Sequence, residues 1–335
     1  MPANDRNAGL VVTVDLGGTK ILICLFDEDG RVADQEWFLT EARRTPETVV
    51  ESIVKGIGRV LTRSGTSIAA LEGVGIAAAG ACDTKSGVVV NGPNLGWRSV
   101  PITRWMSDAL GLPVWLGNDG NMSALGEHLC GAGRGCNNMV YLTVSTGIGG
   151  GIIANGELYV GETGMTAEIG HMVIQSTGPL CPCGKRGCLQ TLCSGTALVR
   201  NMRERLAMGA SSLSMFHPLQ LLDLVESKPE EITSHIIFEA ARRGDALSLS
   251  ILEDGARSLG RGLTNLVLLL DPQMLVIGGG LAVHWDQYIA PAANELRRAT
   301  YPKSLEGLMV VPAVLGDKAA SMGARAMVRQ RSHKR

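Results

Sequence analysis

The sequence predicts an α/β protein of two domains, on three observations. The chain has 335 residues, more than one ordinary hydrophobic core organises. Glycine is frequent, with 43 residues concentrated in short runs. Three of these runs follow apolar segments of strand length, at Gly17, Gly147 and Gly278. We therefore expect an N-terminal α/β domain over residues 1–120 and a larger C-terminal α/β domain over residues 121–335, with a central cleft.

The first predicted element is a hairpin. The apolar runs LVVTV and ILICLF flank a turn at Asp15–Lys20, as in two antiparallel strands joined by a glycine turn. Downstream, Thr45 and Pro46 supply the cap and first position of a helix. Apolar residues recur at helical spacing over Val49–Leu61, so this helix is expected to cover a sheet.

Two further strands are expected to end at a cleft. The small-residue segment Gly73–Asp83 indicates a strand with a tight exit. A short buried strand at Pro113–Leu116 delivers Asn118 and Asp119 at its end. Residues at the carboxyl ends of strands in α/β proteins face clefts, so these two side chains are candidates for a site.

The second half repeats the strand–glycine–strand pattern. The segment MVYLTV turns through STGIGGG and returns at Ile152-Ile153, which echoes the first hairpin. A long helical pattern over Leu247–Leu270 ends before Asp271-Pro272 and is followed by a third strand and glycine turn. Two similar units suggest duplicated α/β domains.

Composition excludes several classes of function. Lys plus Arg number 31 against 32 for Asp plus Glu, so no basic excess attracts nucleic acid. The start MPANDRNAG lacks the features of a secretory signal, so we expect a cytoplasmic protein. No apolar stretch is long enough for a membrane span, so no membrane partner is expected. The eight cysteines should be mostly reduced in that compartment.

Glycine turns at strand ends can present backbone N–H groups to a phosphate, because the absent Cβ allows close approach and positive φ. A single turn of this kind is more often structural. Asp15 adds a carboxylate that could hold a nucleotide-bound Mg²⁺; the alternative interpretation, given less weight, is a residue that caps the turn. None of the turns has the P-loop or dinucleotide-binding pattern, so a nucleotide site here would be of another type.

A metal site is the most specific local prediction. His171, Cys181, Cys183 and Cys188 lie within 18 residues on a glycine-rich stretch and match a tetrahedral structural zinc set. Because the protein fills all four positions, no metal-bound water nucleophile is expected. A zinc-bound imidazole keeps a proton on its other nitrogen, so His171 could also donate a hydrogen bond to an acceptor outside the metal site.

The motifs DLGGTK, STGIGGGII and VIGGGLA resemble the phosphate and adenosine loops of the actin-like ATPase (ribonuclease H-like) fold, and within it the ROK family of repressors, open reading frames and sugar kinases. The resemblance covers nearly the whole chain and implies binding of ATP with Mg²⁺ and a sugar. It assigns nucleotide binding to Asp15, Gly17, Gly18, Thr19, Lys20, Thr146, Gly147, Gly149, Gly150, Gly278, Gly279 and Gly280.

The same resemblance assigns the sugar site and the catalytic base. It implies that His171, Cys181, Cys183 and Cys188 form the zinc site of the family. It also implies that the protein is a homodimer or homotetramer. Asp119 taken alone is more often a helix cap, but the Asn118-Asp119 pair matches the family's sugar-binding Asn and catalytic Asp. The implied sugar contacts are Asn94, Asn118, Asp119, Glu168, His171 and Gln190.

Two positions depart from the family pattern. Gln190 stands where sugar kinases of the family usually have a Glu. The replacement removes a negative charge, so the identity of the preferred sugar stays open. Ala79 replaces a usual Pro and removes no chemical group. Asn94, in the stretch NLGW, matches family glucokinases but could also lie in an ordinary exposed loop.

The predicted function is therefore an ATP-dependent hexose kinase, with glucose first and N-acetylmannosamine or another hexose second. The alternative of another class is a sugar-responsive regulator or sensor without kinase activity. Family repressors carry a DNA-binding domain before the first glycine motif, whereas only nine residues precede Leu10, so the kinase is preferred. A third hypothesis, an actin-like ATPase without a sugar site, leaves the zinc block and Asn118-Asp119 unexplained.

Overall fold

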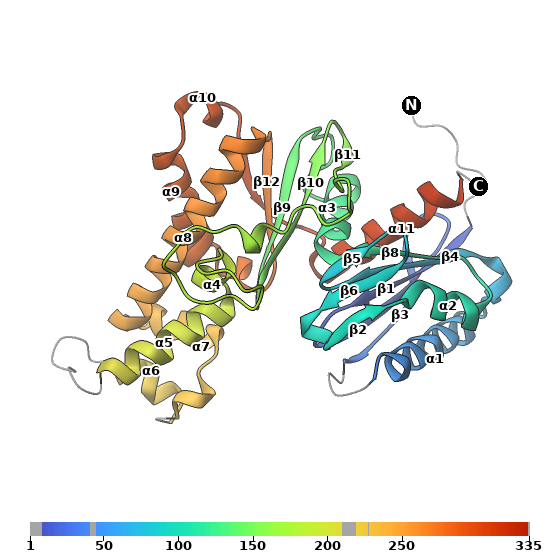
Figure 1. Ribbon diagram of the computed structural model, residues 1–335, viewed down its shortest axis with the longest axis horizontal. Coiled ribbons are helices and arrows are strands. Elements are labelled where there is room, and N and C mark those ends of the chain that lie inside the picture. Colours follow the sequence, from blue (N-terminus) through green and yellow to red (C-terminus); the bar gives the residue numbers. More distant parts are fainter. Residues whose placement is uncertain (1–8, 41–44, 210–218, 227, 334–335) are drawn as a thin grey trace. The chain divides into compact units, whose positions relative to one another are not determined.

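The computed structural model describes residues 9–40, 45–209, 219–226 and 228–333 (Figure 1). Residues 1–8, which contributed to the prediction of a cytoplasmic protein, lie outside these ranges. The chain forms two compact units: Met1–Asn137, Gly151–Ala167 and Val314–Arg335 make the first, and Asn138–Gly150 with Glu168–Ala313 make the second. Three chain segments thus build the first unit. The domain boundary expected at residue 120 stays a prediction.

A five-stranded mixed sheet forms the centre of the first unit, in the order β3-β2-β1-β4-β8. Strands β1, β2 and β3 pair antiparallel, whereas β1 pairs parallel with β4 and β4 with β8. These strands are β1 Leu10–Leu16, β2 Lys20–Phe26, β3 Val32–Leu39, β4 Leu71–Ala78 and β8 Val114–Asn118. A small antiparallel sheet contains β5 Ala81–Asp83, β6 Val88–Gly92 and β7 Trp97–Val100. The predicted first hairpin is confirmed.

The α-helices described in the first unit are α1 Pro46–Ser64, α2 Ile102–Leu110, α3 Asp119–Cys130 and α11 Ala319–Ser332. Helix α1 begins as the sequence predicts, because the Thr45 hydroxyl accepts a hydrogen bond from the Thr48 N–H. It ends at Gly65, which has a φ of 65°. Its buried residues join the core formed with β1, β2 and β4.

Helices α3 and α11 pack against each other through glycine. A Cβ atom at Gly126 would overlap the Ala319 carbonyl oxygen, and one at Gly323 would overlap the Met122 carbonyl oxygen. Their absence lets the two backbones approach closely. Ala320, Ala324, Met327 and Val328 of α11 complete a core cluster that includes residues of β1, β4 and β8.

A buried carboxylate fixes the segment that leads into α11. Glu127 has no exposed surface, and its Oε2 accepts a hydrogen bond from the Ala132 N–H (2.8 Å). Its Oε1 accepts from the N–H groups of Val314 (3.0 Å) and Leu315 (2.8 Å), almost 190 residues along the chain. Glu127 therefore satisfies three backbone donors at one point in the unit.

The second unit is built on another mixed sheet, in the order β11-β10-β9-β12-β13. Strand β10 runs on into the first unit at Gly151, where its last residues pair with β11. Strand β12 pairs parallel with β9 and β13. The strands are β9 Met139–Val144, β10 Ile148–Ala154, β11 Glu157–Leu158, β12 Met274–Gly278 and β13 Met309–Pro312. The second and third predicted glycine turns follow β9 and β12 as expected.

The helices of the second unit are α4 Gln190–Cys193, α5 Gly195–Gly209, α6 Leu219–Leu224, α7 Ser234–Arg242, α8 Ala246–Leu270, α9 Ala290–Ala299 and α10 Pro302–Leu305. Helix α8 agrees with the predicted pattern and ends at Asp271, whose φ is 41°. Within the described ranges, no helix combines the length and apolarity that a membrane crossing would need.

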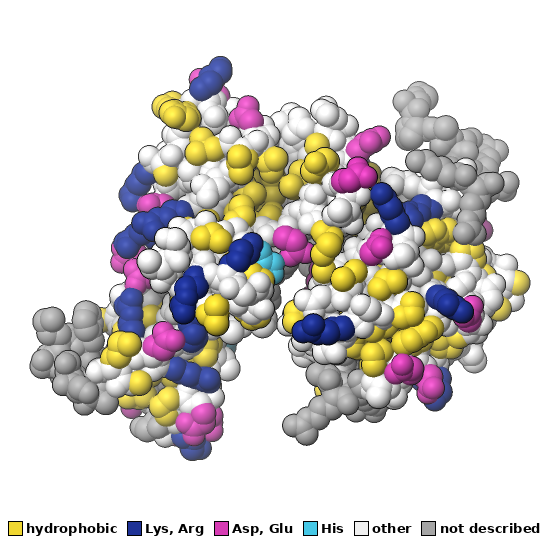
Figure 2. All heavy atoms as spheres, in the orientation of Figure 1, with side chains coloured by type: hydrophobic (Ala, Val, Ile, Leu, Met, Phe, Trp, Pro, Cys, Tyr) yellow, Lys and Arg dark blue, Asp and Glu magenta, His cyan; other side chains and the backbone are white. Residues whose placement is uncertain are grey.

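Charged side chains are interleaved rather than segregated. Figure 2 shows Lys and Arg side chains among Asp and Glu side chains on the face in view. This distribution agrees with the nearly equal numbers of cations and anions in the sequence.

Candidate functional site

The sheet of the first unit brings Asp15 and Asp119 to the end of the sheet where its parallel strands finish. Leu16 of β1 is paired with Ala78 of β4, and Ala78 with Asn118 of β8, so the carboxyl ends of three parallel strands coincide. Burial and the nearby charge of Asp119 raise the pKa of Asp15 to about 7, against the lowering effect of Lys20. A cation at this edge would favour the ionised form of Asp15.

The first glycine turn lies at the same edge. The Gly17 N–H donates to the Lys20 carbonyl oxygen (3.1 Å), and the Lys20 ammonium pairs with Asp317 (2.7 Å). A Cβ atom at Gly18 would lie 2.6 Å from Cβ of Asn94, so glycine lets the turn pack on the predicted sugar loop. The structure thus brings Asn94, an exposed residue, next to the DLGGTK motif.

Asp119 is the first residue of α3, and its side chain is oriented by its neighbours. Its Oδ1 accepts hydrogen bonds from the Gly120 N–H (2.8 Å) and the Asn118 amide (3.1 Å). The same Asn118 amide donates to the Gly80 carbonyl oxygen (3.0 Å), and its oxygen caps the Asn121 N–H (3.0 Å). Asn118, not Asp119, is therefore the residue whose side chain caps the helix.

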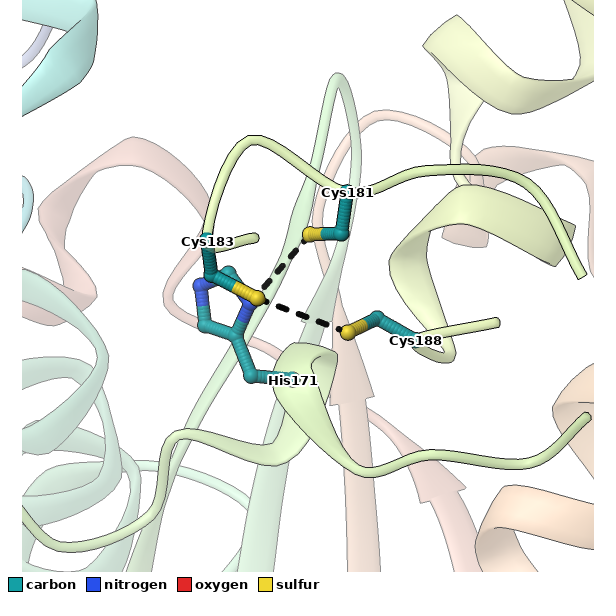
Figure 3. Close-up of side chains that lie close together, drawn as sticks. All are labelled: His171, Cys181, Cys183 and Cys188. Carbon is teal, nitrogen blue, oxygen red and sulfur yellow. Dashed lines mark hydrogen bonds between the residues drawn. The ribbon is translucent and has the colours of Figure 1, made fainter. Parts of the chain in front are cut away.

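The predicted metal ligands gather in the second unit (Figure 3). Ligand atoms of His171, Cys181, Cys183 and Cys188 all lie within 4.8 Å of one another. Cys181 Sγ is 3.5 Å from His171 Nδ1, and Cys183 Sγ is 3.6 Å from Cys188 Sγ. Such separations fit the edges of a tetrahedron with metal–sulfur bonds of about 2.3 Å. The donor set and its spacing therefore fit a structural zinc ion.

The thiols of this cluster differ in acidity. Burial, together with the neighbouring sulfurs, raises the pKa of the Cys188 thiol to about 12. A hydrogen bond from the Lys185 N–H lowers the pKa of Cys183. Metal binding would need every one of these thiols as thiolate.

Of the predicted sugar contacts, His171 belongs to the cluster, and Glu168 and Gln190 lie beside it. His171 Nδ1 faces the sulfurs, whereas its Nε2 lies 3.8 Å from Oε2 of Glu168. The Gln190 amide nitrogen lies 3.4 Å from Cys181 Sγ and donates to it. A hydrogen bond from Gln190 suits a thiolate, and a Glu at this position would bring like charge against it.

A cavity of about 620 Å³ lies in the second unit. It is lined by the turn after β9, including Thr146, by the start of α5, by residues 232–235 and by Gly280 and its neighbours. The Thr146 carbonyl accepts from both the N–H (3.3 Å) and the hydroxyl (2.9 Å) of Thr196, which ties two of these walls together. The size suits a small molecule or nucleotide.

Arg203 and His284 shape this cavity, and no sequence motif indicated either. The Arg203 guanidinium donates to the carbonyl oxygens of Pro229 (3.0 Å), Glu230 (2.7 Å) and Ile232 (3.3 Å), which fixes the wall. His284 stacks on Phe238 with ring centroids 3.8 Å apart. Burial lowers the pKa of His284, which favours the neutral ring. Both contacts join distant segments, which single-sequence patterns do not reveal.

Other predicted nucleotide glycines lie in close-packed places. A Cβ at Gly150 would lie 2.5 Å from Cδ1 of Ile169, and one at Gly278 would lie 2.7 Å from the Tyr141 hydroxyl. Gly279 has a φ of 88° in the turn after β12. Of the predicted set in this unit, Thr146 and Gly280 line the cavity. A role in nucleotide binding stays a prediction for these two residues, as it does for Gly147, Gly149, Gly150, Gly278 and Gly279.

The predicted sugar contacts are divided between the units. Asn94, Asn118 and Asp119 belong to the first, and Glu168, His171 and Gln190 to the second.

Comparison with known proteins adds an independent observation. The model of the ROK family matches residues 11–331. A glucokinase of Streptomyces coelicolor is 35% identical over 323 residues, which are 96% of this chain and 98% of the relative. A crystal structure of a ROK family glucokinase from Streptomyces griseus, in complex with glucose and AMPPNP, is 35% identical with a TM-score of 0.81, over 96% of this chain and 100% of that one. A xylose repressor of Bacillus spizizenii is 28% identical over 97% of this chain and 78% of its own length.

Proposed function

Because the chain belongs to the ROK family, we propose that it is an ATP-dependent hexose kinase with glucose as its first candidate substrate and Asp119 as general base. The observation that carries the proposal is the 35% identity, across nearly the full length, to a glucokinase seen with glucose and an ATP analogue. The orientation of Asp119 by Asn118 and Gly120 supports the assignment of the base.

In the proposed reaction, a hexose hydroxyl attacks the terminal phosphorus of ATP. The new bond joins the sugar oxygen to phosphorus, the bond to the ADP oxygen breaks, and the hydroxyl proton passes to Asp119. Phosphoryl transfer has a loose transition state, so the carboxylate needs to orient the hydroxyl more than to act as a strong base. Hydrogen bonds to Oδ1 of Asp119 hold the carboxylate in one orientation for this task.

Two metals accompany this proposal. Mg²⁺, when bound with ATP, neutralises developing phosphate charge. Asp15 is the proposed residue beside it, since its carboxylate shares the strand edge with Asp119. Zinc is proposed at His171, Cys181, Cys183 and Cys188, where it would orient the imidazole and leave Nε2 for a sugar hydroxyl beside Glu168.

The decisive experiment is sugar-dependent ADP release from MgATP by the zinc-replete protein. Glucose, mannose, fructose, N-acetylglucosamine and N-acetylmannosamine form the panel, with Asp119→Asn as the test variant. We expect turnover on at least one hexose and a loss of about 10²- to 10⁴-fold in kcat in the variant. Asp108→Asn is the matched control, because Asp108 lies on α2 with a largely exposed side chain. Unchanged turnover in Asp119→Asn would remove Asp119 from the mechanism.

A second candidate function is a sugar-responsive regulator without turnover. The similarity to a xylose repressor favours it, as does Gln190 at a position where the sugar kinases usually have Glu. Calorimetric sugar binding without ADP release on any sugar of the panel would support this alternative. Gln190→Glu would then test whether the amide sets the choice of sugar.

The remaining parts of the proposal concern assembly and location. A homodimer or homotetramer is proposed from the family resemblance, and light scattering of the purified protein would measure it. A cytoplasmic location is proposed because ATP and reduced thiols are available there.

A further inference from the structure

Gln190 lies between the cysteine cluster and the turn that follows β9. It is the first residue of α4, directly after the cysteine-rich segment, and its amide nitrogen lies 3.4 Å from Cys181 Sγ. The preceding residue, Leu189, is fully buried, and its N–H donates to the Met172 carbonyl oxygen (2.8 Å). The side chain of Gln190 therefore leaves the backbone at a fixed point.

Two glycines leave room for the amide oxygen of Gln190. A Cβ atom at Gly147, or one at Gly170, would lie 3.3 Å from Gln190 Oε1, which is tighter than an ordinary contact. Gly147 belongs to the turn between β9 and β10, and Gly170 directly precedes His171. The oxygen thus lies against two backbone segments that carry no side chain, while the nitrogen at the other side of the amide faces the sulfur.

The chemistry of the amide selects this orientation. The oxygen of a Gln side chain only accepts hydrogen bonds, whereas its nitrogen donates them. A cysteine that holds a metal does so as the thiolate, which accepts. With the amide turned around, two acceptors would face each other. A metal-bound Cys181 therefore requires the nitrogen of Gln190 on its side, where the structure has it.

The charge of the ligand set makes this hydrogen bond important. Three thiolates outweigh the charge of one Zn²⁺, so the loaded cluster would be an anion. The carboxylate of Glu168, whose Oε2 lies 3.8 Å from His171 Nε2, adds negative charge beside it. A neutral N–H donor stabilises such a cluster, whereas a further carboxylate at position 190 would repel it.

We infer that Gln190 is a positioning residue of the metal site, whose amide holds the Cys181 thiolate and strengthens zinc binding. The inference rests on the proposed zinc site. It gives Gln190 a role besides the sugar contact that the sequence predicts. Groups that hydrogen-bond to metal ligands change metal affinity by about 10- to 100-fold, so the role is measurable.

Zinc affinity is measured first, on the full chain without sugar or nucleotide. A chromophoric chelator competes for the metal at neutral pH under reducing conditions. Gln190→Met removes the donor at nearly the same side-chain length, and its Kd for zinc should be about 10- to 100-fold higher than that of wild type. Gln190→Glu, which brings a carboxylate to the same place, should also raise the Kd by about tenfold or more. An unchanged Kd in Gln190→Met would overturn the inference.

Gln175→Met is the matched control. Gln175 lies between His171 and Cys181 in the same segment, and its side chain is exposed. The hydrogen bond from its N–H to the Gly187 carbonyl oxygen (3.3 Å) belongs to the backbone and survives the substitution. The same chemical change at this position should leave the Kd for zinc unchanged. An equal rise in both variants would refute a specific role for the Gln190 amide.

Cobalt separates the hydrogen bond from a general loosening of the segment. Co²⁺ accepts the same nitrogen and sulfur ligands as zinc and absorbs visible light. An N–H···S hydrogen bond withdraws electron density from sulfur, so its loss in Gln190→Met should move the sulfur-to-cobalt charge-transfer band to longer wavelength. The d–d bands, which report tetrahedral geometry, should keep their intensity. An unmoved charge-transfer band, or lost d–d bands, would overturn the inference, because Gln190 would then act only through the shape of the segment.

Failure of the proposed function gives a different result. If the wild-type chain binds neither zinc nor cobalt, the proposed zinc site fails, and the inference fails with it. If the chain binds zinc but releases no ADP with any sugar, the proposed kinase fails, while chelator competition and the cobalt spectrum still decide the role of Gln190.

Discussion

Glu127 offers a quantitative test of how the first unit is held together. Its two carboxylate oxygens accept hydrogen bonds from the N–H groups of Ala132, Val314 and Leu315, and the side chain is fully buried. Glu127→Gln keeps the shape but replaces one oxygen by an N–H₂ group. Either the Ala132 N–H or the Val314–Leu315 pair then faces a donor instead of an acceptor.

The expected loss follows from these contacts. Hydrogen bonds to a charged group contribute about 1.5–3 kcal/mol each, and a buried donor left without an acceptor costs about 1–3 kcal/mol. Gln loses at least one such bond and weakens the others, so the free energy of unfolding should fall by about 3 kcal/mol. At about 2–4 °C per kcal/mol, Tm should fall by about 6–12 °C.

Differential scanning calorimetry and urea unfolding at neutral pH measure this change. Glu162→Gln is the matched control in the same unit, because the Glu162 side chain is 98% exposed and its pair with Lys85 is long at 3.9 Å. The control should change stability by less than about 0.5 kcal/mol. If Glu127→Gln is no more destabilising than the control, the carboxylate does not hold the segment before α11.

Three further results are expected. The pKa of Asp15 is raised to about 7, so the contribution of this residue to folding stability is present below about pH 4 and is lost as pH rises through about 7. In urea unfolding at several pH values, Asp15→Asn should therefore gain stability relative to wild type as pH rises across that window. A stability difference that stays constant with pH would contradict the raised pKa. Arg203→Met removes the hydrogen bonds that hold the cavity wall at residues 229–232, so the KM for ATP should rise about tenfold while the KM for the sugar stays unchanged. Arg205→Met is the control on the same helix; Arg205 pairs with Asp254, and its loss should leave both constants unchanged. Purified protein should contain about one zinc per chain by mass spectrometry, with Cys183→Ser lowering both zinc content and Tm; full zinc content in that variant would exclude the thiolate as a ligand.

Local features of the fold were predictable from the sequence because their causes are local. Thr45 and Pro46 start α1, and an apolar stripe at helical spacing determines which side of it is buried. The cluster of His171, Cys181, Cys183 and Cys188 was predictable too, since its four residues lie within one short segment. Strand–glycine–strand patterns predicted the hairpin of β1 and β2 for the same reason.

Features that join distant segments were not predictable in this way. Glu127 looks like an ordinary helical glutamate until Val314 and Leu315 are placed beside it. The role of Arg203 depends on carbonyl groups that lie 26 or more residues away in the chain. Each depends on packing, which a pattern of residue types does not specify.

The composition of the first unit from three chain segments has a consequence for synthesis. Helix α11 supplies Ala320, Ala324, Met327 and Val328 to the cluster that covers Val11 and Ala77. During translation these apolar partners do not exist until the ribosome has passed residue 319, although the strands they cover were made long before. The emerging chain therefore exposes an apolar sheet surface during most of its synthesis. We expect a product truncated before α11 to be bound by chaperones or degraded by proteases rather than to fold into a functional protein.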